Sequence, residues 1–301
     1  MTSDPAGRSQ TPDWLAAALA IEPETGTVAV DGTDIAFRAW GPPGEGVVLV
    51  HGSAAHARWW DHLGPLLVGH ERRRVVALDL SGHGDSGHRP AYTLAGWAHE
   101  VVRVAEGAGL AERPIVLGHS MGGLVALLAA RDFGERLGGV VAIDSPLRSA
   151  AAEAQAHHRR LAFVPPRVYR DRAQAVRHFR TVPRQDGEPA VLAHIAGHSV
   201  RAVDGGWSWK FDPRVFARDG LTLGELGRPA CRVALFRAEH GLVPPAMAER
   251  VRDRLGGGVS VIEIPAAAHH VMIDSPLDLV SGLRTLLGGW NPGSAASAEA
   301  G

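Results

Sequence analysis

The residues with the clearest potential for chemistry surround Ser120, in the run Gly118-His119-Ser120-Met121-Gly122. A short apolar run at 115–117 precedes it and a longer one at 124–130 follows. This order predicts a strand, a sharp turn and a helix, and the flanking glycines leave room for a tight turn. The turn projects the serine hydroxyl above the edge of a sheet, at the N-terminus of the helix. A serine held in this way is typical of a nucleophile.

A serine hydroxyl is a weak nucleophile at neutral pH, so it needs a base. His269 and His270 follow a predicted strand at 259–264 and three small residues, Ala266-Ala267-Ala268. Small residues suit a loop that packs close to a nucleophile. We expect His269 to be the base, and His270 is the adjacent alternative.

Two acids could orient that histidine. Asp144 follows the apolar run 140–143, and Glu239 follows the run 233–236. Both strand ends are expected at the same edge as Ser120, and both allow the chain order serine, acid, histidine. The residues by themselves leave the choice open.

An oxyanion hole is predicted where the apolar run 47–50 leads into His51-Gly52-Ser53. Gly52 lets the backbone turn back, so that the Ser53 amide can point at the developing negative charge. The Met121 amide, just after the nucleophile, is the expected second donor. We assign the surrounding side chains to the substrate pocket: His51, Gly52, His119, Trp59, Trp207 and Trp209.

The elements that must position these residues alternate along the chain. A hairpin is predicted at 27–30 and 35–40, around Asp31-Gly32, and buried strands at 47–50, 75–78, 115–117 and 140–143. Helical spacing covers 59–67, 94–106 and 121–133. Strand and helix alternate again at 233–236, 245–255, 259–264 and 277–287. The pattern predicts an α/β fold with a doubly wound, mostly parallel sheet and an antiparallel start.

Residues 147–225 break this rhythm and predict a helical cap inserted into a core made of 26–146 and 226–290. Within the cap we expect helices at 150–163 and 172–179 and no strands. Residues 1–25 form an N-terminal extension that includes a short helix at 14–21, and residues 291–301 are expected to be a flexible tail.

The composition of the chain argues against several classes of protein, including nucleic-acid-binding, disulfide-bonded and membrane-spanning proteins. The chain has 301 residues, 45% of them hydrophobic, with a formal net charge of −1, so it carries no general attraction to nucleic acid or to an anionic membrane. A single cysteine, Cys231, excludes an intrachain disulfide and a cysteine-based metal site. No apolar stretch approaches the ~20 residues that span a bilayer. We therefore expect a cytoplasmic protein with a small-molecule substrate, no cofactor and no metal, as a monomer or homodimer.

Four runs together resemble the α/β-hydrolase fold superfamily, most closely its single-domain esterases and hydrolases with a helical cap. The resemblance covers about residues 26–146 and 226–288, and the runs are Val50-His51-Gly52, Asp79-Leu80-Ser81-Gly82-His83-Gly84-Asp85-Ser86, Gly118-His119-Ser120-Met121-Gly122-Gly123, and His269 with Asp274-Ser275-Pro276.

The resemblance also bears on the acid. Most members carry it after the strand equivalent to 233–236, at a position where this chain has Gly241. Haloalkane dehalogenase-like members place it after the strand equivalent to 140–143, where Asp144 stands. The resemblance therefore favours Asp144, with Glu239 as the alternative.

The nucleophile separates this chain from its near relatives, because dehalogenases and epoxide hydrolases of this fold use aspartate where Ser120 stands. The resemblance implies a serine hydrolase that cleaves a small or medium ester, thioester or lactone. One alternative is a C–C bond hydrolase with the same triad, which a polar, arginine-lined pocket would favour. Another is a receptor-like binding protein with slow turnover.

Overall fold

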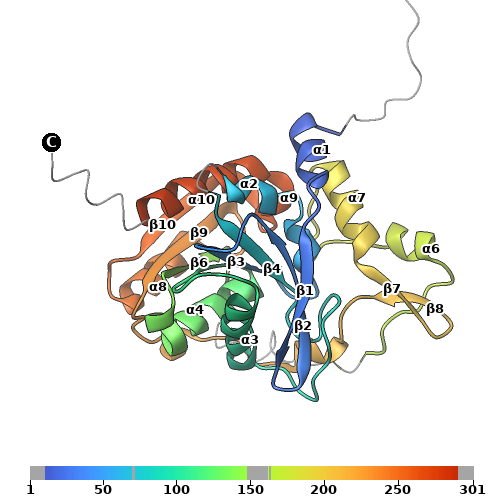
Figure 1. The fold of residues 1–301 in the computed structure, drawn as a ribbon, viewed down its shortest axis with the longest axis horizontal. Coiled ribbons are helices and arrows are strands. Elements are labelled where there is room, and N and C mark those ends of the chain that lie inside the picture. The colour runs from blue at the N-terminus through green and yellow to red at the C-terminus, as the bar shows by residue number, and fades with distance from the viewer. Residues whose placement is uncertain (1–10, 70–71, 148–161, 163, 291–301) are drawn as a thin grey trace, which may run out of the picture.

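The computed structural model describes residues 11–69, 72–147, 162 and 164–290 (Figure 1). The predicted flexible tail, the first ten residues and nearly all of the predicted helix at 150–163 lie outside the described residues.

An eight-stranded sheet forms the centre of the molecule, in the order β1-β2-β4-β3-β5-β6-β9-β10. β1 and β2 form the expected hairpin, β2 pairs antiparallel with β4, and all later pairs are parallel. The sheet is therefore mostly parallel with an antiparallel start, as predicted. Its strands are β1 (Glu24–Val30), β2 (Thr33–Trp40), β3 (Gly46–Val50), β4 (Arg74–Leu78), β5 (Ile115–His119), β6 (Gly139–Ile143), β9 (Arg232–His240) and β10 (Ser260–Ala268).

Helices cover both faces of the sheet (Figure 1). Successive strand residues point to opposite faces, so Val48 and Val50 enter one apolar core while Val47 and Leu49 enter the other. The first core is closed by α3 (Leu94–Gly107), α4 (Met121–Phe133) and α8 (Pro245–Leu255). The second is closed by α1 (Asp13–Leu19), α2 (Gly64–Val68) and α10 (Pro276–Trp290). Burial on both faces explains why the central strands are continuous apolar runs.

Two local predictions need correction. The helix predicted at 59–67 is divided into a 3-10 turn, η1 (Ala57–Trp60), and α2, because Pro65 starts a helix more readily than it continues one. The last strand also runs beyond 264, to Ala268, across a register shift. A short helix, α9 (Val271–Asp274), then precedes α10.

The insertion after β6 is not purely helical, contrary to the prediction. A two-stranded antiparallel hairpin follows α7, and its two-residue loop is Asp204-Gly205. Gly205 takes a positive φ of 78° in this turn, which glycine adopts without strain. The described elements are α6 (Arg172–Arg177), α7 (Pro189–His198), β7 (Val200–Val203), β8 (Gly206–Trp209), η3 (Pro213–Ala217) and η4 (Leu223–Glu225).

This insertion contacts loops at the C-terminal ends of the core strands. The Gly84 amide after β4 donates to the Lys210 carbonyl at 2.7 Å, and the Asp212 amide donates to the Gly82 carbonyl at 2.7 Å. After β10, the Gln185 side chain bonds both the amide and the carbonyl of His270. The insertion therefore lies over the edge of the sheet at which the candidate residues were expected.

Among the described residues, no helix is both long enough and apolar enough to cross a lipid bilayer.

Candidate active site

The candidate residues stand directly after parallel strands. Ser120 follows β5, Asp144 follows β6 and His269 follows β10. The register pairs His119 with Ile143, the last residues of β5 and β6, and it pairs Ala268 with His240, the last residues of β10 and β9. Topology alone therefore brings the serine, the acid and the histidine to one edge, although 149 positions separate the serine from the histidine.

Ser120 occupies a strained bend. Its φ of 54° and ψ of −118° lie outside the regions that ordinary residues prefer, and α4 begins at the next residue. The bend requires a glycine at 122, where a Cβ would lie 2.6 Å from the His51 carbonyl oxygen and overlap that of Val50. The strain holds the hydroxyl out from the backbone at the start of the helix.

His269 connects the serine to the acid. Its Nε2 lies 3.1 Å from the Ser120 Oγ, and its Nδ1 lies 2.7 Å from the Asp144 Oδ2. With Nδ1–H donating to the carboxylate, Nε2 is the acceptor that faces the serine hydroxyl. The histidine is only 3% exposed, so its ring is fixed by packing as well as by these bonds.

Asp144 is fully buried, and its carboxylate accepts hydrogen bonds from backbone amides as well as from His269. The backbone amides of Leu242 and Val243 donate to its carboxylate at 2.7 and 3.3 Å. Glu239, the alternative acid, is exposed and accepts the Ala266 amide at 2.8 Å. The structure thus brings Asp144, and not Glu239, onto the His269 ring.

The predicted oxyanion loop lies against the serine. A Cβ added to Gly52 would be 3.3 Å from the Ser120 Cβ. Within the described part of the chain, neither the Ser53 amide nor the Met121 amide has a hydrogen-bond partner. Met121 is the first residue of α4, where helix amides lack intrahelical acceptors. Both amides are therefore available to a ligand, and they belong to the residues that follow Gly52 and Ser120 in the chain.

His51 and His119, which were assigned to the substrate pocket, are engaged with the backbone. His51 Nδ1 donates to the Gly52 carbonyl at 2.8 Å, and its Nε2 accepts the Leu80 amide at 3.1 Å. His119 Nε2 donates to the His269 carbonyl at 2.8 Å. Burial lowers the pKa of His51 to about 4 and that of His119 well below its ordinary value, so both rings are neutral. In these positions they hold the oxyanion loop and the histidine loop in place.

The three tryptophans assigned to the pocket lie at different distances from the site. The Trp59 ring lies 5.3 Å from the His270 ring, beside the histidine pair, and meets Phe179 edge-on at 6.4 Å. Trp209 packs farther out, against Phe179 at 6.4 Å. The backbone of Trp207 exchanges hydrogen bonds with that of Tyr169. Trp59 is thus the one of the three that reaches the histidine loop, while the hairpin tryptophans stabilise the insertion.

One set of described side chains could hold a metal ion. Single ring nitrogens of His119, His269 and His270 lie within 4.8 Å of one another. His269, however, uses both ring nitrogens for Asp144 and Ser120. An ion there would compete with that chain of hydrogen bonds.

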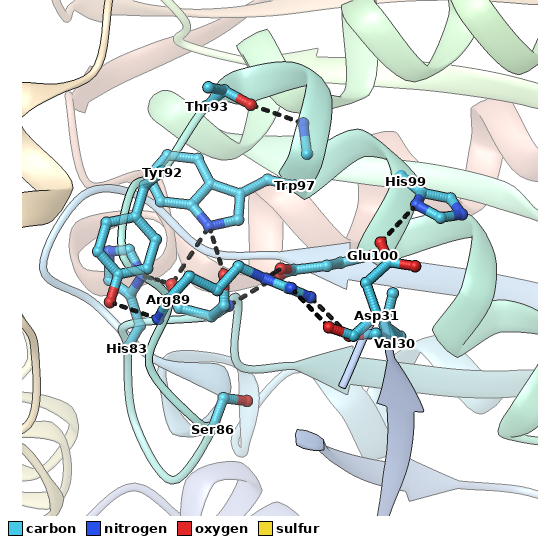
Figure 2. Close-up of polar contacts among 12 residues, drawn as sticks. Val30, Asp31, His83, Ser86, Arg89, Tyr92, Thr93, Trp97, His99 and Glu100 are labelled. Carbon is cyan, nitrogen blue, oxygen red and sulfur yellow. Dashed lines mark hydrogen bonds and ion pairs between the residues drawn. The ribbon is translucent and has the colours of Figure 1, made fainter. Parts of the chain in front are cut away.

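A buried polar network supports the loop after β4 (Figure 2). The Glu100 carboxylate, on α3, accepts the Arg89 Nε–H at 2.7 Å and the Ser81 amide at 2.9 Å. The indole N–H of Trp97 donates to the Ser81 carbonyl at 3.2 Å. These bonds fix both the loop and the indole ring next to it.

Two residues near the site were not singled out by the sequence. Gly241 was noted only as a position without an acid, yet a Cβ there would lie 2.6 Å from the Asp144 Cγ. Arg218 donates from Nη2 to the Ser53 Oγ at 2.8 Å. Nothing local marks this arginine among so many, because its partner lies 165 positions away.

Comparison with known proteins agrees with this architecture. A model of the alpha/beta hydrolase family matches residues 47–282. Lipase LipV of Mycobacterium tuberculosis is 26% identical over 265 residues, covering 85% of this chain and 98% of the lipase. Matches to serine hydrolase-like proteins of Dictyostelium discoideum and Danio rerio cover about a third of those longer chains.

Solved structures show the same fold. The crystal structure of E-2-(acetamidomethylene)succinate hydrolase superposes with a TM-score of 0.74 at 20% identity, covering 89% of this chain and all of that one. A thermophilic esterase from Thermogutta terrifontis superposes with a TM-score of 0.63 at 22% identity, covering 90% of this chain and 99% of the esterase. The family match spans most of the chain and includes the elbow, both candidate acids and the histidine, and the fold is the one that this family shares. This chain is a hydrolase that belongs to the alpha/beta hydrolase family.

Proposed function

We propose that this hydrolase cleaves small or medium carboxylic esters, or the related thioesters and lactones, through an acyl-enzyme on Ser120. The observation that carries the proposal is the continuous chain of hydrogen bonds from the Ser120 hydroxyl through His269 to Asp144. A hydroxyl activated in this way attacks carbonyl carbon, and the elbow exposes it to substrate.

In the proposed mechanism, His269 Nε2 takes the proton from Ser120 Oγ as the oxygen bonds to the carbonyl carbon. The carbonyl oxygen becomes an oxyanion, and the Ser53 and Met121 amides bind it. Each such donor contributes about 3 kcal/mol to transition-state stabilisation. The imidazolium, held by Asp144, then gives its proton to the departing alcohol, and the C–O bond of the ester breaks.

Water completes the cycle. His269 removes a proton from a water molecule, which attacks the acyl carbon and forms a second tetrahedral intermediate. Collapse of that intermediate returns the proton from His269 to Ser120 Oγ and releases the carboxylic acid. The same groups serve both halves of the reaction, and the chemistry needs no further reactant.

A second candidate is hydrolysis of a C–C bond in a β-diketone-like substrate with the same three residues. The Arg218 guanidinium beside Ser53 favours it, because this chemistry suits a polar pocket lined by arginine. A panel containing short esters and a β-diketone acid separates the two candidates by the product that accumulates.

Labelling with a fluorophosphonate probe tests the proposed nucleophile, followed by a chain-length panel of 4-nitrophenyl esters. The proposal expects one adduct on Ser120, loss of labelling in Ser120→Ala and turnover of the shorter esters. A folded protein that resists the probe and leaves every ester intact would overturn it in favour of a binding protein.

A further inference from the structure

Arg218 contacts the proposed oxyanion loop. It follows η3, and its Nη2 donates to the hydroxyl of Ser53, the residue whose amide is proposed to bind the oxyanion. Its guanidinium also lies over the Trp97 ring, 5.8 Å from the ring centroid. A positive charge thus lies within one hydrogen bond of the residue that is proposed to bind the reacting carbonyl.

No acid neutralises this charge within the described residues. The Ser53 hydroxyl is the one hydrogen-bond acceptor that Arg218 has there, and the Nε–H is buried with no acceptor. Burial lowers the pKa of Arg218 to about 10, which still leaves it charged at neutral pH. Arginine carries five N–H donors in a planar fork, so most of its donors remain available.

A largely buried cation without a counter-ion destabilises a fold, and proteins normally pair such a charge with a carboxylate. The neighbouring groups do not provide one. His83 is buried beside the same ring, and its burial, with a further contribution from the Arg218 charge, lowers its pKa well below the ordinary value. Trp97 offers only the face of its indole, and the bonds of that ring to Ser81 hold it in place (Figure 2).

Arg218, Ser53 and Ser120 are each partly exposed. Solvent therefore reaches part of each of these residues, including the one that carries the charge.

We propose that Arg218 binds a carboxylate on the substrate, so that the preferred substrates of Ser120 are short esters carrying a second, anionic group. This inference rests on the proposed function and adds a substrate class to it. The carboxylate would complete the ion pair that the fold leaves open, and the planar fork suits two-point contact with a carboxylate. Because the Ser53 hydroxyl bonds Arg218 and the Ser53 amide is proposed to bind the carbonyl oxygen, the carboxylate and the scissile carbonyl must be joined by a short chain.

The test compares the monomethyl esters of succinic, glutaric and adipic acids with the matching dimethyl esters, by pH-stat. The measured quantity is the ratio of kcat/KM for the anionic ester to kcat/KM for its neutral partner. The protein should prefer at least one of the anionic esters by about 10- to 100-fold, the range of a charged hydrogen bond. Arg218→Gln should abolish the preference mainly through KM, and Arg218→Lys should restore part of it.

Arg252→Gln is the matched control, because it removes the same charge from an exposed arginine on α8 that pairs with Asp253. It should keep the parent ratio. A parent that prefers the neutral esters, or an Arg218→Gln protein that keeps the parent ratio, would overturn the proposal.

A binding measurement separates this failure from that of the proposed function. The Ser120→Ala protein, which binds without turnover, is titrated with monomethyl glutarate by calorimetry. Binding that Arg218→Gln removes supports the carboxylate site even if no ester is cleaved, whereas esters cleaved without any anionic preference contradict the site alone. Circular dichroism and thermal melting establish that each variant is folded.

Discussion

The Asp144 carboxylate fills the space that a side chain on Gly241 would need. A Cβ on Gly241 would lie 2.6 Å from the Asp144 Cγ and would overlap both carboxylate oxygens. The next two amides, those of Leu242 and Val243, donate to the same carboxylate. In most members of the superfamily that the sequence resembles, the loop after this strand carries the acid itself. Here the loop after β9 instead donates hydrogen bonds to Asp144, which follows β6. Glycine at 241 and aspartate at 144 are therefore two parts of one arrangement.

Adding a methyl group at Gly241 should impair catalysis without a comparable effect on folding. In Gly241→Ala the Asp144 carboxylate must move, and a displacement of about 1 Å in catalytic geometry costs on the order of 10²-fold in rate. Gly258→Ala is the control, because a Cβ there meets nothing within 4 Å. Steady-state kinetics on a short ester should show kcat/KM falling at least about tenfold for Gly241→Ala, and equal rates for the two variants would refute the arrangement.

Exchanging each candidate acid for its amide should separate their roles. Asp144→Asn places an amide against His269 Nδ1 and disfavours the tautomer in which Nε2 faces Ser120, so kcat should fall on the order of 10³- to 10⁴-fold. Glu239→Gln changes an exposed side chain that bonds the Ala266 amide, and its kcat should stay within about threefold. The reverse ranking in kcat would transfer the role to Glu239.

Much of this arrangement was predictable from local sequence. The central strands were visible as apolar runs because helices bury them on both faces, and parallel pairing then placed Ser120 and His269 at one edge. The helix after the elbow was predicted with its observed bounds, Met121–Phe133, because glycine and the apolar spacing mark its start and course.

Other features depend on contacts that no local pattern encodes. The bond from Arg218 to Ser53 joins segments 165 positions apart, and the charge could not be told from those of exposed arginines. The hairpin of β7 and β8 did have a local signal, Asp204-Gly205, but our prediction assigned the whole insertion from the helical patches at 150–163 and 172–179 and did not use it. We interpreted Gly241 only as a position that lacks the usual acid. The role of this glycine depends on where Asp144 lies in space, which the local sequence does not show.

The buried carboxylate of Glu100 should be important for stability. It is 1% exposed and pairs with Arg89 and the Ser81 amide, so Glu100→Ala leaves a cation and an amide without their partner and should lower the free energy of unfolding by about 3–5 kcal/mol. Glu106, on the same helix, is 41% exposed, and Glu106→Ala should change it by less than about 1 kcal/mol. Urea unfolding of both variants tests this contrast, and similar losses would contradict it.

Asp79 should make the free energy of unfolding fall as the pH rises from 4 to 7. Its carboxylate accepts the amides of Ala57 and Asp85, yet burial raises its pKa from 3.8 to about 6. The folded state therefore holds a proton that the unfolded state releases between pH 4 and pH 6. The stability that this proton provides is present below about pH 4 and is lost as the pH rises through 6.

Urea unfolding of the parent and of Asp79→Asn, from pH 4 to pH 7, isolates this effect because other groups cancel in the difference. The variant should be less stable than the parent at pH 4, because the NH2 group of its amide cannot accept one of the two backbone bonds. Relative to the variant, the parent should lose on the order of 3 kcal/mol between pH 4 and pH 7. A difference that stays constant with pH would show that Asp79 does not titrate in this window.

The most direct test of the central claim is the rate at which Ser120→Ala hydrolyses a short 4-nitrophenyl ester, measured beside the parent at neutral pH. If Ser120 forms the acyl-enzyme, kcat should fall by a factor on the order of 10⁶, leaving only the slow reaction supported by binding and the oxyanion loop. A Ser120→Ala protein that retains the parent kcat would contradict the account.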